Sequence, residues 1–588
     1  MTPPAIGAIA PVIKVAGSEL AASTLSALIG MTVSSGLRLP SRARLDFLDD
    51  GFSISAGTTF DLGAKVVVAA GTTTLFTGEI TGVELDVDRG ASNLRVIADD
   101  AAYKMTLGNK TVTYAQMSYS DIVSKIVAAY GLTASISSTG DVQEYVLQTD
   151  SDFGFITEIA DRVGYDWWVD GGGTFQFHPM GAQSDLVATL TWGSDLASLR
   201  HFTVRASALH PQQVTVNGWD AGQKQPLTAQ SQSVGTKPDA SLVTPYLDAS
   251  SLASSSKVTT AYRMFGTQGD GAKLADSAAI RALAGSVVAE GRCGIIAAIV
   301  VGKKVSISDV GPASGTYPVT EVEHIYSENG FDTRFVAGDR EPTSLVDTLA
   351  APVPSSFRQD ALVIGVVTNL GDSNSPKGYI KVKYPTLGSQ IESAWARVVS
   401  MGAGSSRGMT FLPEVNDEVI IGFEGGDVTR PLVLGGLYSG ASPALDYGTK
   451  DGSIEKRQIV SRLGHVVELG DGQQPADQHI WLTLAGGEHA VKLGKDGLTA
   501  TVPSGEPVSI SAGDTKIEFD KQGNITLSGQ KVTIKATQDV EISGMNVKLK
   551  ANVAVEASGT QAKMSGSAQA ELSSGGQTSV KGSMVMIN

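Results

Sequence analysis

Residues 508–555 read VSISAGDTKIEFDKQGNITLSGQKVTIKATQDVEISGMNVKLKANVAV, a series of short segments in which apolar and polar side chains alternate. Alternation with a period of two residues is the pattern of a β-strand that buries one face. The pattern recurs every six to nine residues, and the segments begin at Val508, Ile517, Ile525, Val532, Val540, Val547 and Val553. Weaker copies continue to Val585 and Ile587. Residues 504–588 are therefore predicted to be a repeat of short strands.

A single chain cannot close a core with this repeat. A single-chain solenoid needs about 20 residues or more per coil, and a lone strand with one apolar stripe leaves its edges open. Three identical chains wound together would pair every edge and bring the stripes together on one axis. We therefore predict a C-terminal intertwined trimeric β-helix, with an ordinary antiparallel sheet or an amyloid-like repeat as the alternative. Replacing Ile534 or Ile542 with Asp is expected to prevent assembly, because carboxylates would be buried near the axis.

The composition limits the function classes. The chain has 588 residues, enough for several domains, and 42% of them are hydrophobic. A net charge of −15 argues against a nucleic-acid partner held by a basic surface. The lone Cys293 excludes an intrachain disulfide framework. No signal peptide or transmembrane helix is indicated, so we expect synthesis in the cytoplasm and exit only as cargo of a machine or by lysis.

The order of patterns predicts a mainly β protein with five regions. Residues 1–350 are expected to form a hub of tandem β-barrels with an α/β segment inserted at about 101–180. A Pro- and Ser-containing linker at 351–360 follows. Residues 361–440 contain five strand patterns, the number in a small closed barrel of the OB type. Transition hairpins at 441–503 lead into the shaft at 504–588.

Individual elements are predicted inside the hub. Amphipathic patterns indicate helices at 118–131, capped by Ser118 or Ser120, and at 152–163. A paired strand motif is expected at 165–169 and 174–177, and an Ala-rich helix at 274–289. Residues 294–301 are interpreted as a core strand, and residues 228–256 as a loop or connector. The sequence does not decide whether Trp167 and Trp168 are core or surface.

Residues 361–440 resemble the barrel of VgrG proteins and phage baseplate spike proteins. Residues 378–385 read GYIKVKYP, Trp395 is followed by Arg397 and Val398, and residues 411–419 read FLPEVNDEV. The segment GDVTRPLVLGGLY at 426–438 completes the match, and RLGH at 462–465 is similar to the family's entry into its β-helix. In the hub, similar segments lie at 76–78, 121–123, 148–155, 163–165, 216–220 and 315–324. The opening of the hub looks more like spikes of extracellular contractile injection systems.

The resemblance implies a structural homotrimeric hub–spike of a contractile injection system. Such a spike caps the inner tube, meets the baseplate proteins and pierces the target membrane mechanically when the sheath contracts. Its tip usually carries a PAAR-type protein, and effector cargo is a further partner of the family. The particle is expected in the cytoplasm or released. Whether the machine is a phage tail, a type VI secretion system or an extracellular particle stays open.

The last residues are the predicted docking site for the tip protein. They combine apolar side chains with open strand edges, which three copies would join into a small platform; they are Met584, Val585, Met586, Ile587 and Asn588. A frayed end is the plainer alternative.

No catalytic, metal or cofactor site is predicted. Residues 404–408 (GSSRG) match the G-x-S-x-G pattern, but they lie between barrel strands rather than between a strand and a helix. The seven His residues show no zinc spacing, and Asp514 and Asp520 are interpreted as turn residues. Asp417, Glu418, Asp427 and Arg430 are expected to fix barrel loops and contacts between protomers. The competing function is a tailspike-like glycan-degrading enzyme, which needs longer coils and an acidic cleft.

Overall fold

The computed structural model describes residues 10–88, 90–182, 185–193, 199–206, 213–220, 223–232, 239–247, 257–260, 265, 267–285, 287–338, 361–373, 375–388 and 390–587. The chain divides into two compact units, Met1–Ser442 and Pro443–Asn588. The predicted linker at 351–360 lies outside the described residues.

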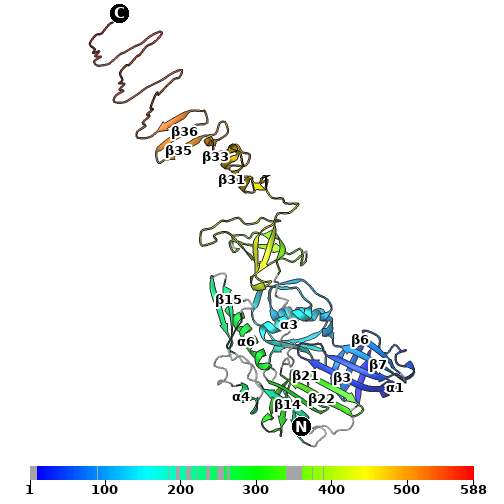
Figure 1. The fold of residues 1–588 in the computed structure, drawn as a ribbon. Coiled ribbons are helices and arrows are strands. Elements are labelled where there is room, and N and C mark those ends of the chain that lie inside the picture. Colours follow the sequence, from blue (N-terminus) through cyan, green and yellow to red (C-terminus); the bar gives the residue numbers. More distant parts are fainter. Residues whose placement is uncertain are drawn as a thin grey trace. The chain divides into compact units, whose positions relative to one another are not determined.

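A 14-stranded sheet dominates the described part of the first unit (Figure 1). Its main path runs β14 (Leu199–Ala206), β19 (Val287–Gly294), β22 (Gly330–Ala337), β21 (Gly315–Ser327), β3 (Leu28–Gly36), β4 (Arg42–Leu48), β7 (Ala91–Asp99), β6 (Thr73–Asp88), β5 (Lys65–Ala70), β1 (Pro11–Val15) and β2 (Ser18–Glu19). Off this path lie β13 (Leu186–Thr191), β17 (Asp239–Ala240) and β20 (Lys304–Ser308). Short helices at α1 (Ala22–Ser26) and α4 (Thr244–Leu247) flank it.

The strands of this sheet follow their sequence pattern. In β4, Ala43, Leu45 and Phe47 are fully buried while the residues between them are polar. One hydrophobic core gathers around Phe47 and Phe76, and a second gathers around Tyr317 and Phe335. The sheet thus has an apolar face that carries two cores and a polar face opposite.

The inserted α/β segment contains both predicted helices. Helix α2 (Tyr119–Ala129) begins with a capping box between Ser118 and Asp121, and α3 (Asp152–Val163) ends at Gly164 in the left-handed conformation. Around them lie β8 (Val112–Ser118), β9 (Thr133–Ile136), β10 (Val142–Gln148), β11 (Tyr165–Val169) and β12 (Thr174–Pro179). Both tryptophans of β11 are buried.

A second small module follows in the chain, and here two predictions need correction. The Ala-rich helix is α6 (Gln268–Ala284), and residues 287–289 belong to strand β19 because the helix ends at Gly285. That strand ends at Gly294, so residues 295–301 are irregular rather than a core strand. Helix α6 packs on β15 (Gln213–Asp220) and β16 (Gln225–Gln230), beside β18 (Lys257–Thr260). The predicted connector at 228–256 is not loop throughout, because it includes the end of β16, strand β17 and helix α4.

Five strands close into a small barrel, as predicted. They are β23 (Val363–Asn369), β24 (Tyr379–Lys383), β25 (Ala396–Val398), β26 (Glu418–Phe423) and β27 (Pro431–Gly436). Strand β25 is shorter than the predicted 393–399. The barrel core includes Leu147 of β10, and the Tyr145 hydroxyl donates to the Glu392 carbonyl at 2.8 Å. The inserted segment is thus docked on the barrel.

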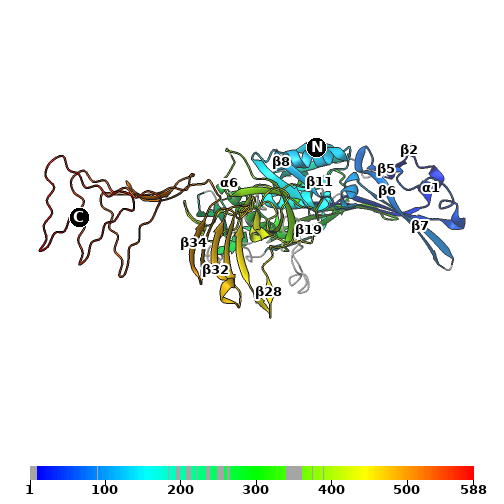
Figure 2. The same ribbon diagram turned by 90° about the horizontal axis from the view of Figure 1, so that it is seen from above.

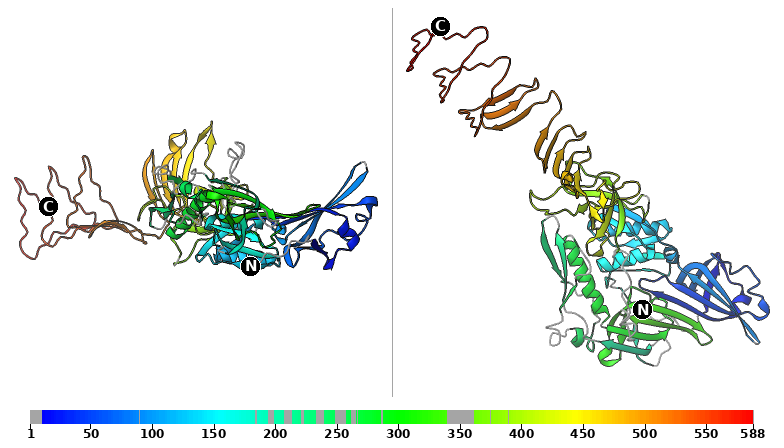
Figure 3. Two further views of the ribbon diagram at one scale, coloured as in Figure 1. Left: turned by 90° about the horizontal axis from the view of Figure 1, so that it is seen from below. Right: turned by 45° about the horizontal axis from the view of Figure 1, so that its top comes forward.

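The second unit contains antiparallel sheets rather than a compact core. A hairpin, β28 (Thr449–Lys450) and β29 (Ser453–Ile454), precedes β30 (Lys456–Val460), β31 (Val466–Asp471), β32 (Gln478–Thr483), β33 (Ala490–Gly494) and β34 (Gly497–Thr501). Strands β35 (Val508–Ala512), β36 (Thr515–Phe519) and β37 (Ile525–Ser528) form a further sheet. After β37 the described chain turns back and forth without strand pairing (Figure 3).

The mainly β fold with its five-stranded barrel is confirmed. Within one chain, the antiparallel alternative holds for residues 508–528 of the repeat, and the predicted hairpins before it pair in the same way. The intertwined trimeric β-helix stays a prediction, because its strands would pair with other chains.

Candidate functional site

The sheet β30–β34 exposes a continuous apolar face. Its register aligns Ile459, Val467, Leu482 and Val491 in one row and Leu469, Ile480, Leu493 and Leu498 in a second. These eight side chains are 39–72% exposed. Isolated exposed apolar residues are ordinary, but a contiguous patch marks an interaction surface.

The next sheet, β35–β37, repeats the arrangement. Ile510, Ile517 and Leu527 lie opposite one another across its three strands, and all three are exposed. The residues that alternate with them, such as Ser509 and Glu518, are polar. Two successive sheets therefore each carry an apolar face that the single chain leaves uncovered.

The opposite face of β30–β34 is polar and internally bonded. Glu468 is buried, its carboxylate accepts a hydrogen bond from the Gln458 amide at 2.5 Å, and His479 Nε2 lies 2.8 Å away. Burial opposes the charge, but the bonds from Gln458 and His479 hold the pKa of Glu468 below its ordinary value. The carboxylate of Glu468 is thus satisfied within its own sheet, whereas the apolar face has no cover in the single chain.

The predicted docking residues lie at the end of this unit. Met584, Met586 and Ile587 are at least 79% exposed, and Val585 is about half exposed. Asn588 lies outside the described residues. All described residues from 530 to 587 are exposed, and Ile534 and Ile542 are among them.

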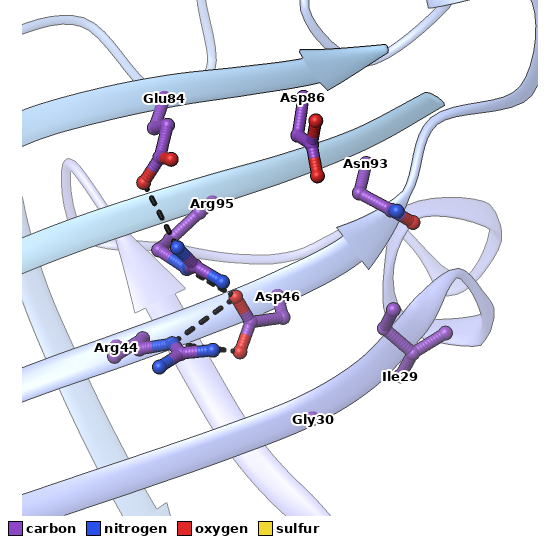
Figure 4. Close-up of a pocket in the computed structure, with 8 residues that line it drawn as sticks. All are labelled: Ile29, Gly30, Arg44, Asp46, Glu84, Asp86, Asn93 and Arg95. Carbon is purple, nitrogen blue, oxygen red and sulfur yellow. Dashed lines mark hydrogen bonds and ion pairs between the residues drawn. The ribbon is translucent and has the colours of Figure 1, made fainter. Parts of the chain in front are cut away.

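A charged pocket lies on the polar face of the hub sheet, where sequence reasoning proposed no site (Figure 4). Its volume is about 240 Å³, and it is lined by Ile29, Gly30, Arg44, Asp46, Glu84, Asp86, Asn93 and Arg95. The Arg95 guanidinium lies between two carboxylates, with Nε 2.8 Å from Asp46 and Nη1 2.9 Å from Glu84. These bonds raise the pKa of Arg95. The charged residues that alternate with apolar ones in β4, β6 and β7 are visible in the sequence. Only the register of the three strands shows that these charges meet in one pocket.

The other half of the same face has a similar ion-pair network. Arg334 lies 2.7 Å from Glu290 and 3.1 Å from Glu323, and Arg292 lies 2.6 Å from Asp332. Cross-strand pairs of this kind fix register more than they add stability, because exposed pairs contribute only about 0–1 kcal/mol.

The structure gives no catalytic arrangement to residues 404–408. They form a tight loop closed by a bridge between Gly404 and Arg407, between β25 and β26, and neither a strand directly before it nor a helix directly after it adjoins the loop. Among the described residues, no group of three His, Cys, Asp or Glu side chains is placed to hold a metal ion. His210 lies outside them.

The charged barrel residues hold loops, as expected. Asp417 accepts from the Glu414 amide at 2.7 Å, and Asp427 accepts from the Thr429 amide at 2.9 Å. Arg430 bonds to Glu424 at 2.8 Å and donates to the Trp219 carbonyl, which ties the barrel to the second module. Glu418 begins β26. Their predicted contacts between protomers stay a prediction.

Comparison with known families identifies two regions of the chain. Residues 363–438 match the type VI secretion system/phage-baseplate injector OB domain, which is the closed barrel described above. Residues 7–328 match the Alg8 N-terminal domain, and because this match spans more than half of the chain, the protein belongs to that family. The injector OB domain match confirms the resemblance to VgrG-like spikes and supports a structural role in a baseplate or spike.

Several solved structures are similar in fold. The E. coli c3393 protein, a type VI secretion component, has 14% identity and a TM-score of 0.47, with 72% of this chain and 99% of that chain covered. A chain of the half-lidded PdpA–VgrG complex of Francisella has 9% identity and a TM-score of 0.48, with 84% of this chain and 87% of that chain covered. The 43 kDa tail protein of prophage MuSo2 from Shewanella oneidensis has 12% identity and a TM-score of 0.44, covering 56% and 97%. No curated protein matches.

None of the described helices combines the length and the apolar run that crossing a bilayer requires.

Proposed function

We propose that this protein is the non-enzymatic, homotrimeric hub–spike of a contractile injection system. The observation that carries the proposal is the uncovered apolar face of β30–β34 and β35–β37, which needs further copies of the chain to bury it. The injector OB domain supports the type of machine.

Three copies are the number that suits this face. A sheet with one apolar side is stable only when that side packs on another layer. Three identical sheets arranged around an axis would bury all their apolar rows against one another and leave the polar faces outside. The opposite face agrees with this role, because the buried carboxylate of Glu468 already has its hydrogen bonds within the sheet.

The same proposal assigns a role to each region of the chain. The hub meets the inner tube and baseplate, the barrel forms a collar, and the shaft pierces the target membrane when the sheath contracts. Residues 584–588 dock a PAAR-type tip protein through their exposed apolar side chains. Synthesis in the cytoplasm is followed by assembly into the particle.

The molecular mass in solution tests the proposal. We expect light scattering of the full chain to give three times 60.9 kDa. The variant Ile534→Asp should reduce this mass, because it would place three carboxylates near the axis. Lys535→Asp is the matched control, since it introduces the same side chain at the neighbouring, polar position and should leave the trimer intact. A monomeric wild-type chain would reject the proposal.

The absence of enzymatic activity has its own test. Purified trimer should release no oligosaccharide from bacterial surface glycans. Turnover that survives purification would favour the tailspike-like alternative instead.

A further inference from the structure

Three parts of the first unit meet around one pocket of about 590 Å³. The inserted segment, the second module and the barrel each contribute polar or aromatic side chains to its lining; among them are Tyr119, Arg162, Phe265, Asp270, Asp427 and Arg430. Pockets that hold small ligands measure roughly 300–1,000 Å³ and are common where domains meet. The size and the position of this pocket therefore both suit a ligand.

Direct bonds between the three parts fix the walls of the pocket. Lys273 of α6 forms an ion pair with Asp141 of the inserted segment. The inserted segment is bonded to the barrel through Tyr145, and the barrel is bonded to the second module through Arg430. Figure 2 shows α6 beside β8 and β11 of the inserted segment, and α6 packs on α3 of the same segment. The pocket is thus enclosed by parts that hold one another in place.

Two buried side chains bring unbonded oxygen atoms to this pocket. Tyr119 and Asp427 are each only 6% exposed. Oδ1 of Asp427 accepts from the amide of Thr429 at 2.9 Å and from its hydroxyl at 2.6 Å. Among the residues that the structure describes, Oδ2 of Asp427 and the hydroxyl of Tyr119 have no hydrogen-bond partner. Because buried polar atoms are nearly always bonded, these two oxygens mark where a ligand would bond.

The charge of the pocket selects the kind of ligand. Four acidic and two basic side chains line it, and two of these six are paired with residues outside the lining, Asp141 with Lys273 and Arg430 with Glu424. Three carboxylates and one guanidinium remain; they are Glu144, Asp270, Asp427 and Arg162. Three negative charges against one positive charge leave an excess of two negative charges, which favours a cation over an anion.

The remaining features of the lining agree with a cationic ligand. Burial opposes the charge of Arg162, but Tyr119, Asp427 and Asp270 raise its pKa, so the surrounding acidic groups already balance this guanidinium. Burial raises the pKa of Tyr119 to about 12, so its hydroxyl stays neutral and its oxygen can accept a hydrogen bond from a cation. The rings of Tyr119, Tyr145 and Phe265 also line the pocket, and aromatic rings attract ammonium and guanidinium groups.

We propose that this pocket binds an organic cation, whose ammonium or guanidinium group donates hydrogen bonds to Asp427 and Tyr119. Such a group is carried by a lysine or arginine side chain of a partner protein and by a free polyamine. The chemistry at Asp427 and Tyr119 is the same for both sources, and the test distinguishes them. Because the residues that carry the inference belong to the first unit of one chain, it does not rest on the proposed homotrimer.

The test is isothermal titration calorimetry on the full chain. The probes are N-acetylargininamide for a side chain, spermidine for a free polyamine, and N-acetylcitrullinamide as the uncharged analogue of the first. We expect at least one of the two cations to bind, and the citrulline derivative to bind about tenfold or more weaker than the arginine derivative, because a hydrogen bond to a charged group contributes about 1.5–3 kcal/mol.

Two variants locate the site. Asp427→Asn should weaken binding of the cation about tenfold or more, while its amide oxygen can still accept from Thr429 and keep the loop. Tyr119→Phe removes only the hydroxyl and should weaken binding about threefold or more. Asp417→Asn is the matched control, since it neutralises another carboxylate of a barrel loop that does not line the pocket, and it should bind as the wild type does.

Each outcome decides for or against the site. Tighter binding of spermidine would assign the site to a free polyamine, and tighter binding of the arginine derivative would assign it to a side chain of a partner; both support the inference. Equal binding of the citrulline and arginine derivatives would overturn it, as would unchanged binding by Asp427→Asn. A wild-type chain that binds neither cation would show that the pocket holds only solvent. The wild-type titrations need no variant, so they decide even if a substitution lowers the melting temperature.

Discussion

Replacing Leu482 with Ala should weaken assembly without weakening the chain's own fold. Leu482 lies in the centre of the apolar face, between Val467 and Val491, and is 46% exposed in the single chain. Full burial of a leucine contributes about 1.5–3 kcal/mol, so covering the exposed half contributes about 1 kcal/mol per chain. Three chains together would lose about 3 kcal/mol, a factor of more than 100 in the assembly equilibrium.

The assay is the guanidinium midpoint at which the full-length trimer dissociates, followed by mass and by circular dichroism. The control is Lys492→Ala, which shortens a side chain on the polar face of the neighbouring strand. We expect Leu482→Ala to lower the midpoint and Lys492→Ala to leave it within error. Equal midpoints for the two variants would refute the idea that the apolar face is covered by other copies.

Three further predictions concern other regions. Burial lowers the pKa of His324 to about 4, so the unfolded chain binds a proton at this imidazole more tightly than the folded chain does. The hub's free energy of unfolding should therefore fall by about 3 kcal/mol as the pH drops from about 6.5 to about 4. His324→Gln should flatten that part of the hub's pH–stability curve. Gly291→Ala should destabilise the hub by about 1–3 kcal/mol, since the added methyl group would meet the ring of Phe335 across the sheet, and the hub's melting temperature checks this. Met586→Asp should abolish capture of a tip protein in a pull-down while leaving the trimer's mass unchanged.

Helices and strands were predictable wherever a single short sequence pattern determines the local structure. Helix α3 was expected with its observed bounds from its amphipathic pattern, and the structure shows the local reasons for those bounds: Ser151 caps the helix and Gly164 ends it. The barrel was expected from five strand patterns and from motif segments. By contrast, the predicted helix at 274–289 ran too far, because the apolar residues Val287, Val288 and Ala289 come soon after Gly285 but belong to strand β19.

The candidate sites depended on information that a linear pattern does not carry. The apolar repeat was visible in the sequence, but which residues align across β30–β34 requires the register. The charged face of the hub joins residues as distant in the chain as Asp46 and Arg95.

The register of the sheet β30–β34 limits how this part of the chain can evolve. Insertion of a single residue inside one strand would turn over the side chains beyond it, and apolar residues of that strand would then face the side that carries Glu468. Insertion of two residues would keep the two faces apart. Relatives should therefore vary in length at the turns between these strands rather than inside them.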